Sequence, residues 1–415
     1  MQDVKDYIKR LFKVPMLIVF FIICIVLLPS AINLRSIAFR AGIVVALGID
    51  MVQDNKYILD AVITIPSLSE DLNENNKIIT STGTTISDAL GNMNLVFGRA
   101  IRLGHVRFIV IGQALSNSNV AVAIDGVIRT NKIRDSVQLL MCESSVHELF
   151  NAGIELKNKT GIRLSDIVCH LEDYSTTSFD SNVDSFYKGY FSKTKISKLN
   201  SLSLVEDYTQ GISTSPQEAC GQNANGNKQS NNQQTGGKYI SNVGKMAIYK
   251  DGQLQDILSE ELVTAMSWIN GASLPKKLVV DFMGFLNISK ICYEVLSKSV
   301  VTEAFFLKGV PIYCCKINLT IDINEIISEN PDIVSKSDYN NVIEEENKTL
   351  IGRQIRKQIG QALDYSKKTK LDIMDINNYF YLNVLDEYNR YMEHKSCEEF
   401  LEDIQLNVDV NIKII

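Results

Sequence analysis

Histidines and cysteines are the residues of this chain whose chemistry could support catalysis or metal binding. The four histidines, His105, His147, His170 and His394, are widely separated in the sequence. Glu148 follows His147, but Asn151 stands where the zinc-binding HExxH pattern needs its second imidazole. We therefore expect structural or incidental roles for the histidines and no metal site.

Adjacent pairs and glycine-rich segments give no catalytic signature either. Cys169 and His170 are neighbours, and neighbouring side chains on a helix point about 100° apart, which disfavours a thiolate–imidazole pair. Residues 221–228 place their lysine one position late for a phosphate-binding loop, and no apolar strand precedes them. The sequence thus predicts a protein that is not an enzyme and binds no cofactor. An active site assembled from distant residues is the alternative.

Composition and charge narrow the class of protein further. The chain has 415 residues, 45% of them hydrophobic and 22% charged, which suits two or three packed domains. Its net charge of -6 disfavours an extended nucleic-acid surface, because such surfaces are basic. Eight cysteines without a CxxC pair are too sparse for a disulfide scaffold. We expect a globular protein that binds no nucleic acid.

An uncharged apolar segment lies close to the N-terminus. It runs from Val14 to Leu28 and stays uncharged to Ile32, and as a helix it would span roughly 28 Å at about 1.5 Å per residue. More basic residues precede it than follow it closely, so the N-terminus should be cytoplasmic and the rest of the chain should face outward. We predict a retained transmembrane helix, a signal anchor. A buried core helix and a cleaved signal are alternatives, and lipidation of Cys24 is disfavoured because Ile23 precedes it.

Strand and helix patterns alternate in the first half of the exported part. Residues 41–61 predict two short strands joined by a polar turn, and residues 84–97 have the spacing of an amphipathic helix. Further strand patterns lie at 105–112 and 136–141, and further helix patterns at 119–129 and 144–152. This alternation predicts mixed α and β layers.

A polar segment from about residue 213 to 238 divides the exported part. Gly, Asn, Gln and Ser dominate it, and such a segment buries too little apolar surface to offset the entropy of ordering. We accordingly assign residues 1–32 to a cytoplasmic stub and transmembrane anchor, 33–205 to an N-terminal α+β region of one or two subdomains, 206–240 to a flexible polar linker, and 241–415 to a C-terminal α+β domain.

The segment after this linker combines a hairpin, long helices and alternating strands. Asp251-Gly252 predicts a tight hairpin turn. Helical patterns occupy 341–366 and 375–392, and the two-residue period of half-buried strands occupies 317–323 and 406–414. We expect an antiparallel sheet backed by the helices. The predicted fold class is therefore α+β: an N-terminal transmembrane helix followed by two or three mixed α/β domains with mainly antiparallel sheets.

An ordered set of short motifs carries a resemblance to a known family. These are residues 33–37, 42–50, 82–90 and 103–112 with Arg129 and Arg134, then 244–254 and 369–372 before the alternating strand that ends the chain. Their order resembles the Ger(x)C family, the C subunits of nutrient germinant receptors in endospore-forming bacteria. The resemblance extends from about residue 33 to the end.

The resemblance implies a non-enzymatic subunit that acts in spore germination. It implies two integral membrane partners, the germinant receptor A and B subunits, and a location on the outer face of the spore inner membrane. Family members are usually lipoproteins with a modified cysteine, whereas this chain has Ile32, Asn33 and Leu34 at that place. A transmembrane helix would give the same tethering. Whether a small molecule binds this subunit directly is left open.

The family motifs single out nine residues with structural or partner-contact roles: Arg35, Gly48, Asp50, Gly83, Gly104, His105, Arg129, Arg134 and Asp372. We expect the three glycines to permit tight turns, with binding as the alternative. We expect His105 to be a hydrogen-bonded structural histidine at the start of a strand, with a ligand contact or pH switch as the alternative. For the two later arginines, an ion pair competes with a partner contact.

Two other functions compete with the receptor subunit. An extracytoplasmic solute-binding protein would need a substantial interdomain cleft lined by convergent polar groups. A cell-envelope enzyme would need distant Asp, Glu or His side chains to meet in one pocket. Domains that lie side by side without such a cleft would favour the receptor subunit.

Overall fold

The fold is that of a computed structural model, which describes residues 42–52, 55–64, 76–131, 133–160, 164–169, 179–206, 238–241, 244–271, 274–281, 288–328 and 344–415. The predicted anchor and Arg35 lie outside these ranges. Within them, no helix has the length and apolar character that a membrane crossing requires.

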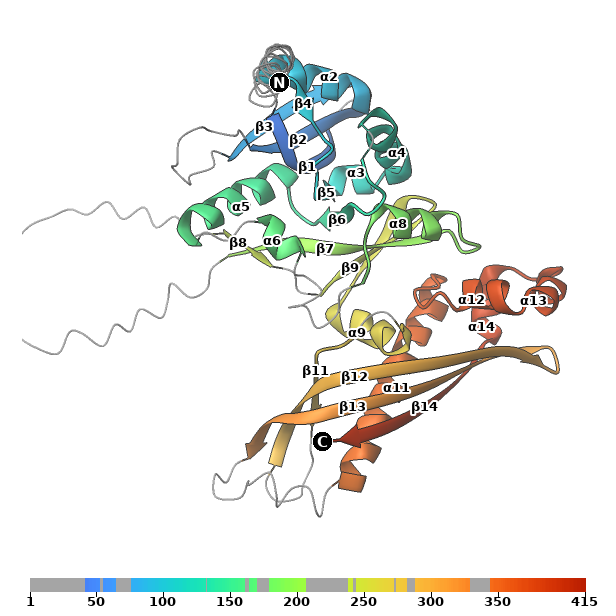
Figure 1. The fold of residues 1–415 in the computed structure, drawn as a ribbon. Coiled ribbons are helices and arrows are strands. Elements are labelled where there is room, and N and C mark those ends of the chain that lie inside the picture. The colour runs from blue at the N-terminus through green and yellow to red at the C-terminus, as the bar shows by residue number, and fades with distance from the viewer. Residues whose placement is uncertain are drawn as a thin grey trace, which may run out of the picture.

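A large mixed sheet forms the first half of the molecule (Figure 1). Its strand order is β10-β9-β7-β6-β5-β1-β2-β3. The strands are β1 (Gly42–Val52), β2 (Lys56–Thr64), β3 (Asn76–Gly83), β5 (Phe108–Ile111), β6 (Gln138–Cys142), β7 (Ile196–Glu206), β9 (Met246–Lys250) and β10 (Gln253–Leu258). Short strands β4 (Ile101–Arg102) and β8 (Lys238–Ser241) pair with β1 and β7.

Helices cover both faces of this sheet. They are α2 (Ile86–Phe97), α3 (Gln113–Ser116), α4 (Val120–Asn131), α5 (Val146–Thr160), α6 (Leu164–Cys169) and α8 (Val183–Tyr190). One core contains side chains of α2, α4 and α8, and a second contains those of α5 and α6. In β1, Leu47 belongs to the first core and Ala46 to the second, as expected where consecutive side chains point to opposite faces.

The centre of the large sheet is parallel, which differs from the prediction of mainly antiparallel sheets. β1, β5, β6 and β7 run in one direction, and antiparallel hairpins flank them at both edges. Helices fill the connections between β5, β6 and β7, and such crossovers return the chain to the starting edge of the sheet. The mixed α and β layers predicted from the alternation are confirmed.

The second half has a four-stranded sheet backed by a long helix (Figure 1). Its order is β11-β12-β13-β14. The strands are β11 (Lys277–Asp281), β12 (Ile288–Leu307), β13 (Val310–Ser328) and β14 (Gln405–Ile414). The helices are α9 (Glu260–Ile269), α11 (Glu344–Thr369), α12 (Ile376–Asn383), α13 (Leu385–Met392) and α14 (Cys397–Asp403). Buried residues of both sheet and helices form one core.

Two expectations for this half are wrong. β13 and β14 pair in parallel, with Ile312 opposite Gln405 and Ile321 opposite Ile414, because the helices α11 to α14 carry the chain back before β14 begins. The helix predicted at 375–392 is two helices, α12 and α13, since Val384 leaves helical geometry at φ -136° and ψ 47°. The long helix and the hairpin at Asp251 are confirmed.

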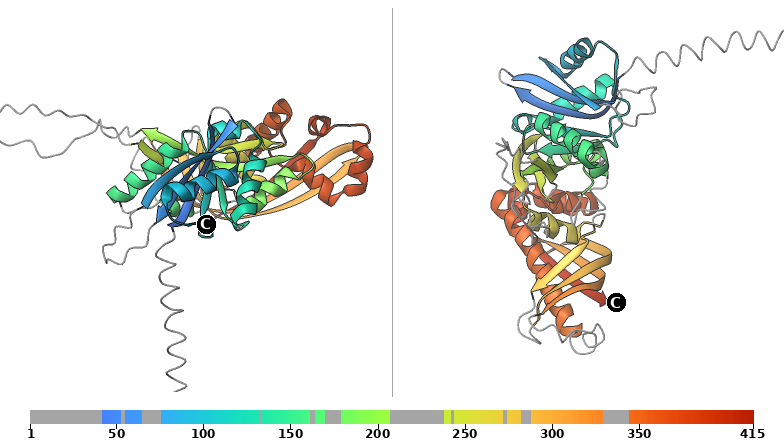
Figure 2. Two further views of the ribbon diagram at one scale, coloured as in Figure 1. Left: turned by 90° about the horizontal axis from the view of Figure 1, so that it is seen from above. Right: turned by 90° about the vertical axis from the view of Figure 1, so that its left-hand side faces the viewer.

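Strands before and after the polar segment pair with one another, and the domain division predicted there stays a prediction. β7 ends at Glu206, where the predicted linker of residues 206–240 begins, and Glu206 pairs with Lys238 at the start of β8. β9 then pairs with β7 over Ile196 to Asn200. The chain on both sides of the segment therefore belongs to the same sheet. The right-hand view of Figure 2 shows the two halves of the molecule end to end.

Candidate functional site

The family-motif residues lie at several separate places. Gly48 and Asp50 lie in β1, Gly83 ends β3, Gly104 and His105 lie in the turn before β5, Arg129 lies in α4, Arg134 follows α4, and Asp372 lies between α11 and α12. The sequence order of the motifs thus does not correspond to one cluster of side chains. The contacts of each residue indicate its role separately.

Asp50 is a partly buried carboxylate that fixes the start of α3. Its Oδ1 atom accepts hydrogen bonds from the backbone N–H of Leu115 at 2.9 Å and of Met51 at 2.8 Å. Burial raises the pKa of Asp50, while these backbone donors act in the opposite direction. A Cβ atom on Gly112 would lie 2.0 Å from Asp50 Cγ, so the glycine there leaves room for the carboxylate.

Gly48 permits close packing and not the predicted turn. It lies inside β1, where a Cβ atom would be 2.1 Å from Cγ1 of Val146 and 3.1 Å from Phe150. Helix α5 can therefore approach the strand only because the side chain is missing. The expectation of a turn is wrong for this residue, whereas Gly104 does lie in a turn, closed by the Val106 N–H donating to Leu103 O.

Gly83→Ala should lower the free energy of unfolding by about 1–3 kcal/mol. An added Cβ would lie 2.3 Å from the backbone N and 2.7 Å from Cα of Ala89, and the backbone of α2 cannot move aside as a flexible side chain would. Gly83 therefore permits the close approach of α2 directly after β3, and the predicted turn there stays a prediction. Denaturant unfolding followed by circular dichroism measures the change.

Gly104→Ala is the matched control for that substitution. No heavy atom lies within 4 Å of a Cβ built there, so its unfolding free energy should stay within about 0.5 kcal/mol of the parent. Equal losses in the two variants would contradict the packing explanation.

His105 is exposed and lines a pocket between the sheet and α5. The pocket has a volume of about 270 Å³, and Arg107, Phe108 and Phe150 also line it. Phe108 begins β5, so His105 precedes the strand by a short turn. The structural role assigned to His105 stays a prediction.

Arg129 and Arg134 have different surroundings. Arg129 Nε lies 2.7 Å from Asp125 Oδ2 one helical turn earlier, so of the two roles open from the sequence it forms the intramolecular ion pair. This pair raises the pKa of Arg129. Both partners are largely exposed, so the pair contributes little to stability. Arg134 is exposed beyond the end of α4.

An aspartate–histidine contact joins α5 to β2. His147 Nδ1 lies 3.1 Å from Oδ1 of the buried Asp60, and the Thr80 hydroxyl donates to the same oxygen. The Thr80 hydroxyl and the Asp60 carboxylate both lie beside Nδ1 of His147. These three side chains therefore hold α5 against the sheet. The structural role predicted for His147 agrees with these contacts.

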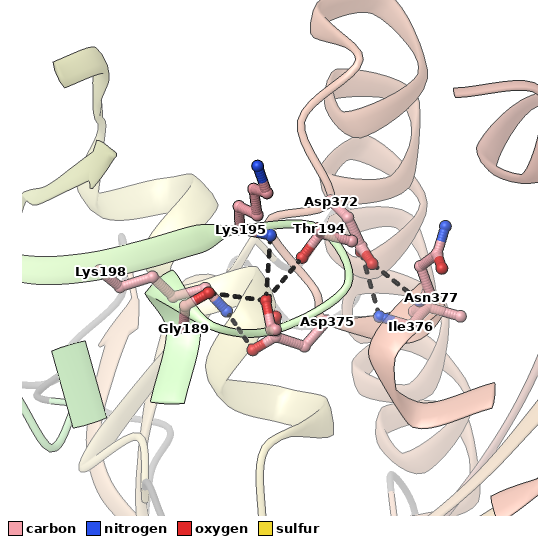
Figure 3. A network of polar contacts seen from close by, with 9 residues as sticks. Gly189, Thr194, Lys195, Lys198, Asp372, Asp375, Ile376 and Asn377 are labelled. Atoms are coloured by element: carbon pink, nitrogen blue, oxygen red, sulfur yellow. Dashed lines mark hydrogen bonds and ion pairs between the residues drawn. The ribbon is translucent and has the colours of Figure 1, made fainter. Parts of the chain in front are cut away.

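Asp372 forms the most deeply buried polar site of the motif residues (Figure 3). It is 1% exposed, and its two oxygens accept hydrogen bonds from the N–H of Ile376 at 3.1 Å and of Asn377 at 2.7 Å. Burial, and secondarily the nearby Asp375 carboxylate, raise the pKa of Asp372 to about 7. The carboxyl group therefore organises the first turn of α12 while its charge changes near neutral pH.

The next polar contact links the two halves of the molecule. Asp375 has a left-handed backbone with φ 57°, and its Oδ2 accepts from Lys198 Nζ of β7 at 2.8 Å. Lys198 is 17% exposed on its side chain, so solvent screens the pair less than it screens a surface pair. Figure 3 shows Lys198 reaching from the first sheet toward the loop that carries both aspartates. We call this set, Lys198, Asp372, Asp375 and Asn377, the junction network.

Further charges extend the junction network along the same boundary. Lys370 Nζ lies 2.8 Å from Glu398 Oε2, and Lys193 Nζ lies 4.8 Å from the ring centroid of Tyr381. A pocket of about 210 Å³ lies among these residues, with Asp372 in its wall. The arrangement can hold the two halves at one angle. No three His, Cys, Asp or Glu side chains of the described ranges lie close enough to share a metal ion.

Sequence reasoning missed Lys198, Asp375 and Trp268. Trp268 is fully buried, and its Nε1 donates to Gln358 Oε1 at 2.8 Å, so it joins α9 to α11. An aspartate just before a helical pattern is a recognisable capping signal, and it could have indicated Asp375. No local signal could have paired it with Lys198, because the contact depends on the fold.

Two families of spore germination domains match this chain. Residues 40–199 match the family described as the spore germination protein N-terminal domain. Residues 244–415 match the family described as spore germination B3/GerAC like, C-terminal. Lys198 falls in the first match and Asp375 in the second, so the junction network joins the two matched domains.

Two individual proteins are similar to this chain. YfkR of Bacillus subtilis (strain 168), whose name assigns it provisionally to spore germination, is 20% identical over 332 residues, which cover 79% of this chain and 75% of that protein. A crystal structure of the GerBC protein is 15% identical, with a TM-score of 0.49, and the alignment covers 89% of this chain and 96% of that one.

Proposed function

The chain belongs to the spore germination family described by these two domain matches, and from this premise we propose that it is a non-enzymatic, membrane-anchored subunit of a spore germinant receptor. In that role it acts in nutrient-triggered germination, and its task is contact with other subunits. The single observation that carries the proposal is the order of the matches, N-terminal domain then C-terminal domain, over 40–199 and 244–415.

The proposed anchor is the apolar segment from Val14 to Ile32. The basic residues before it favour a cytoplasmic N-terminus, which puts the two matched domains outside the membrane. For a receptor of spores, the proposed location is the outer face of the spore inner membrane. The proposed partners are the A and B membrane subunits of the receptor.

The contacts of the motif residues are intramolecular and stabilise the fold. Asp50 and Asp372 accept hydrogen bonds from the first turns of helices, and Gly48 and Gly83 permit close packing. The alternative, an extracytoplasmic solute-binding protein, is less well supported. Its interdomain cleft would need roughly 300–1,000 Å³ for a small ligand, whereas the junction pocket has about 210 Å³.

Spores that lack this chain test the proposed function. In a strain without other germinant receptors, they should lose their response to the nutrients that trigger the parent strain, and they should still germinate with a stimulus that bypasses receptors. Loss of optical density and release of spore-core solutes measure the response. A normal nutrient response without this chain would remove the proposal.

Complementation and purification distinguish a direct role in germination from an indirect effect of losing the chain. The full chain should restore the nutrient response, and detergent extraction of spore membranes should co-purify it with the A and B subunits. Digestion of sealed vesicles by protease should remove residues 42–415 only from the face that corresponds to the outside. Digestion of that part from the cytoplasmic face alone would contradict the proposed orientation.

A further inference from the structure

Two adjacent apolar side chains are strongly exposed at the end of α2. Leu95 is 80% exposed, the highest value among the large hydrophobic side chains of the described residues, and Val96 is 65% exposed. Single exposed apolar residues are ordinary on protein surfaces, so exposure alone does not indicate a binding surface. The position of Leu95 and Val96 beside the start of β1 is the second observation.

The exposed pair lies where the N-terminal part of the chain joins the first sheet. The Gly42 N–H donates to Ala100 O at 3.0 Å, and Gly42 pairs with Ile101 of β4. A Cβ atom on Gly42 would lie 2.5 Å from Phe97 Cε1, so the chain passes directly against the end of α2. Gly42, the first described residue, therefore lies at the corner between α2 and β4.

The length of the preceding chain limits the distance to the bilayer. The proposed anchor ends at Ile32, so residues 33–41 connect it to the corner. These residues can span at most roughly 30 Å at about 3.3 Å each. The tether therefore keeps Gly42 and the adjoining corner within roughly 30 Å of the end of the proposed anchor, and Figure 1 shows α2 and β4 at the opposite end from the C-terminal sheet.

The charge of the corner fits an anionic bilayer. Arg99 and Arg102 are exposed on the same short segment as Leu95 and Val96. The sequence from residue 89 to residue 124 contains no aspartate or glutamate, so no acidic side chain of that stretch opposes them. Apolar side chains beside arginines are the composition of surfaces that bind at the interface of anionic membranes.

The corner also has a fixed shape. Gly98 ends α2 with φ 67°, and its N–H donates to Asn94 O at 2.9 Å. The Asn94 side-chain oxygen accepts from the Ile101 N–H at 2.9 Å. The exposed pair and the two arginines are thus presented by one braced turn and need little ordering when they bind.

We propose that this corner, formed by Leu95, Val96, Arg99 and Arg102, docks on the anionic lipid surface of the bilayer that holds the anchor. Leu95 and Val96 enter the interfacial region, and the arginines contact lipid phosphates. The inference rests on the proposed membrane anchor. It deepens the proposed function, because docking at this corner directs the C-terminal sheet away from the membrane.

Tryptophan fluorescence in defined vesicles tests the docking. The chain contains one tryptophan, Trp268, which is fully buried and gives a constant background. Full-length Leu95→Trp and Val96→Trp variants, reconstituted alone into phosphatidylglycerol vesicles, should emit at shorter wavelength than in detergent. Lipids brominated near the headgroup should quench most of the added emission.

Matched controls use apolar residues that are exposed elsewhere. Leu382 in α12 is 68% exposed and Val122 in α4 is 59% exposed. Leu382→Trp and Val122→Trp should show no quenching by brominated lipid. Arg99→Gln with Arg102→Gln should reduce the quenching of Leu95→Trp in phosphatidylglycerol vesicles. Quenching of Leu95→Trp and Val96→Trp no stronger than that of the controls would overturn the proposal.

Alkaline carbonate washing separates this inference from the anchor itself. A chain that stays with the vesicles after washing but shows no quenching at positions 95 and 96 retains its anchor and lacks the docked corner, which overturns only the inference. A chain released by the wash has no anchor, and that result overturns both. The circular dichroism spectrum of each variant shows that it is folded.

Discussion

Trp268→Ala should lower the free energy of unfolding by about 3–5 kcal/mol. The indole is fully buried between α9 and α11, and the residues around it belong to the core that the C-terminal sheet shares with its helices. Removal leaves a cavity that neighbouring side chains cannot fill without moving the long helix. It also leaves Gln358 without the 2.8 Å hydrogen bond from Nε1.

The Trp268→Ala variant lacks the only tryptophan of the chain, so its unfolding is followed by circular dichroism and not by tryptophan fluorescence. Trp268→Phe keeps most of the volume and loses only the indole donor, so a smaller loss of about 1–2 kcal/mol is expected. Leu382→Ala, at a residue 68% exposed in the same half, should stay within about 0.5 kcal/mol of the parent. A Trp268→Ala variant as stable as Leu382→Ala would mean that α9 does not pack on α11.

Asp372→Ala should destabilise the chain by about 2–5 kcal/mol at pH 6, because two buried backbone N–H groups lose their acceptor. These belong to Ile376 and Asn377 at the start of α12. Asp372→Asn retains an acceptor oxygen and should lose much less. Denaturant unfolding of the three proteins at the same pH checks the order.

The same carboxyl group should make stability depend on pH. The pKa of Asp372 in the folded chain is raised to about 7 by burial, whereas an aspartate in an unfolded chain has a pKa of about 3.9. The folded state therefore binds the proton more tightly between these values, so the free energy of unfolding falls as the pH rises from about 4 to about 7, and it levels off above.

Asp372→Asn should flatten that pH dependence. The control is Asp409→Asn at an exposed aspartate of β14, which should keep the slope of the parent. Melting temperatures measured across this pH range give the slopes. Parallel curves for Asp372→Asn and the parent would show that another group titrates.

Local elements were predictable because their signals are local. The period of residues 84–97 predicted α2, the turn at Asp251-Gly252 predicted the β9–β10 hairpin, and both are confirmed. The direction of β14 was not predictable, because the alternation of apolar and polar residues is the same in a parallel and an antiparallel strand. Only the connection through α11 to α14 decides that direction.

In the candidate site too, features with a local signal were predictable and features that depend on the fold were not. Asp372 was identified through a family motif, but its burial depends on the packing of α12 and α14 around it. The pairing of Asp375 with Lys198 joins residues that are 177 positions apart, and no spacing rule reaches that far. Gly48 was expected to permit a turn and instead permits a close approach of α5, since sequence cannot distinguish a turn from a close approach of another element.

The pairing of Glu206 with Lys238 has a practical consequence for work on living spores. Because both ends of the polar segment meet in adjacent strands, a reporter protein whose own termini lie close together could replace the segment without stretching the sheet. Such a fusion would make the proposed receptor subunit visible by fluorescence from within the chain, without a tag before residue 42 or after residue 415.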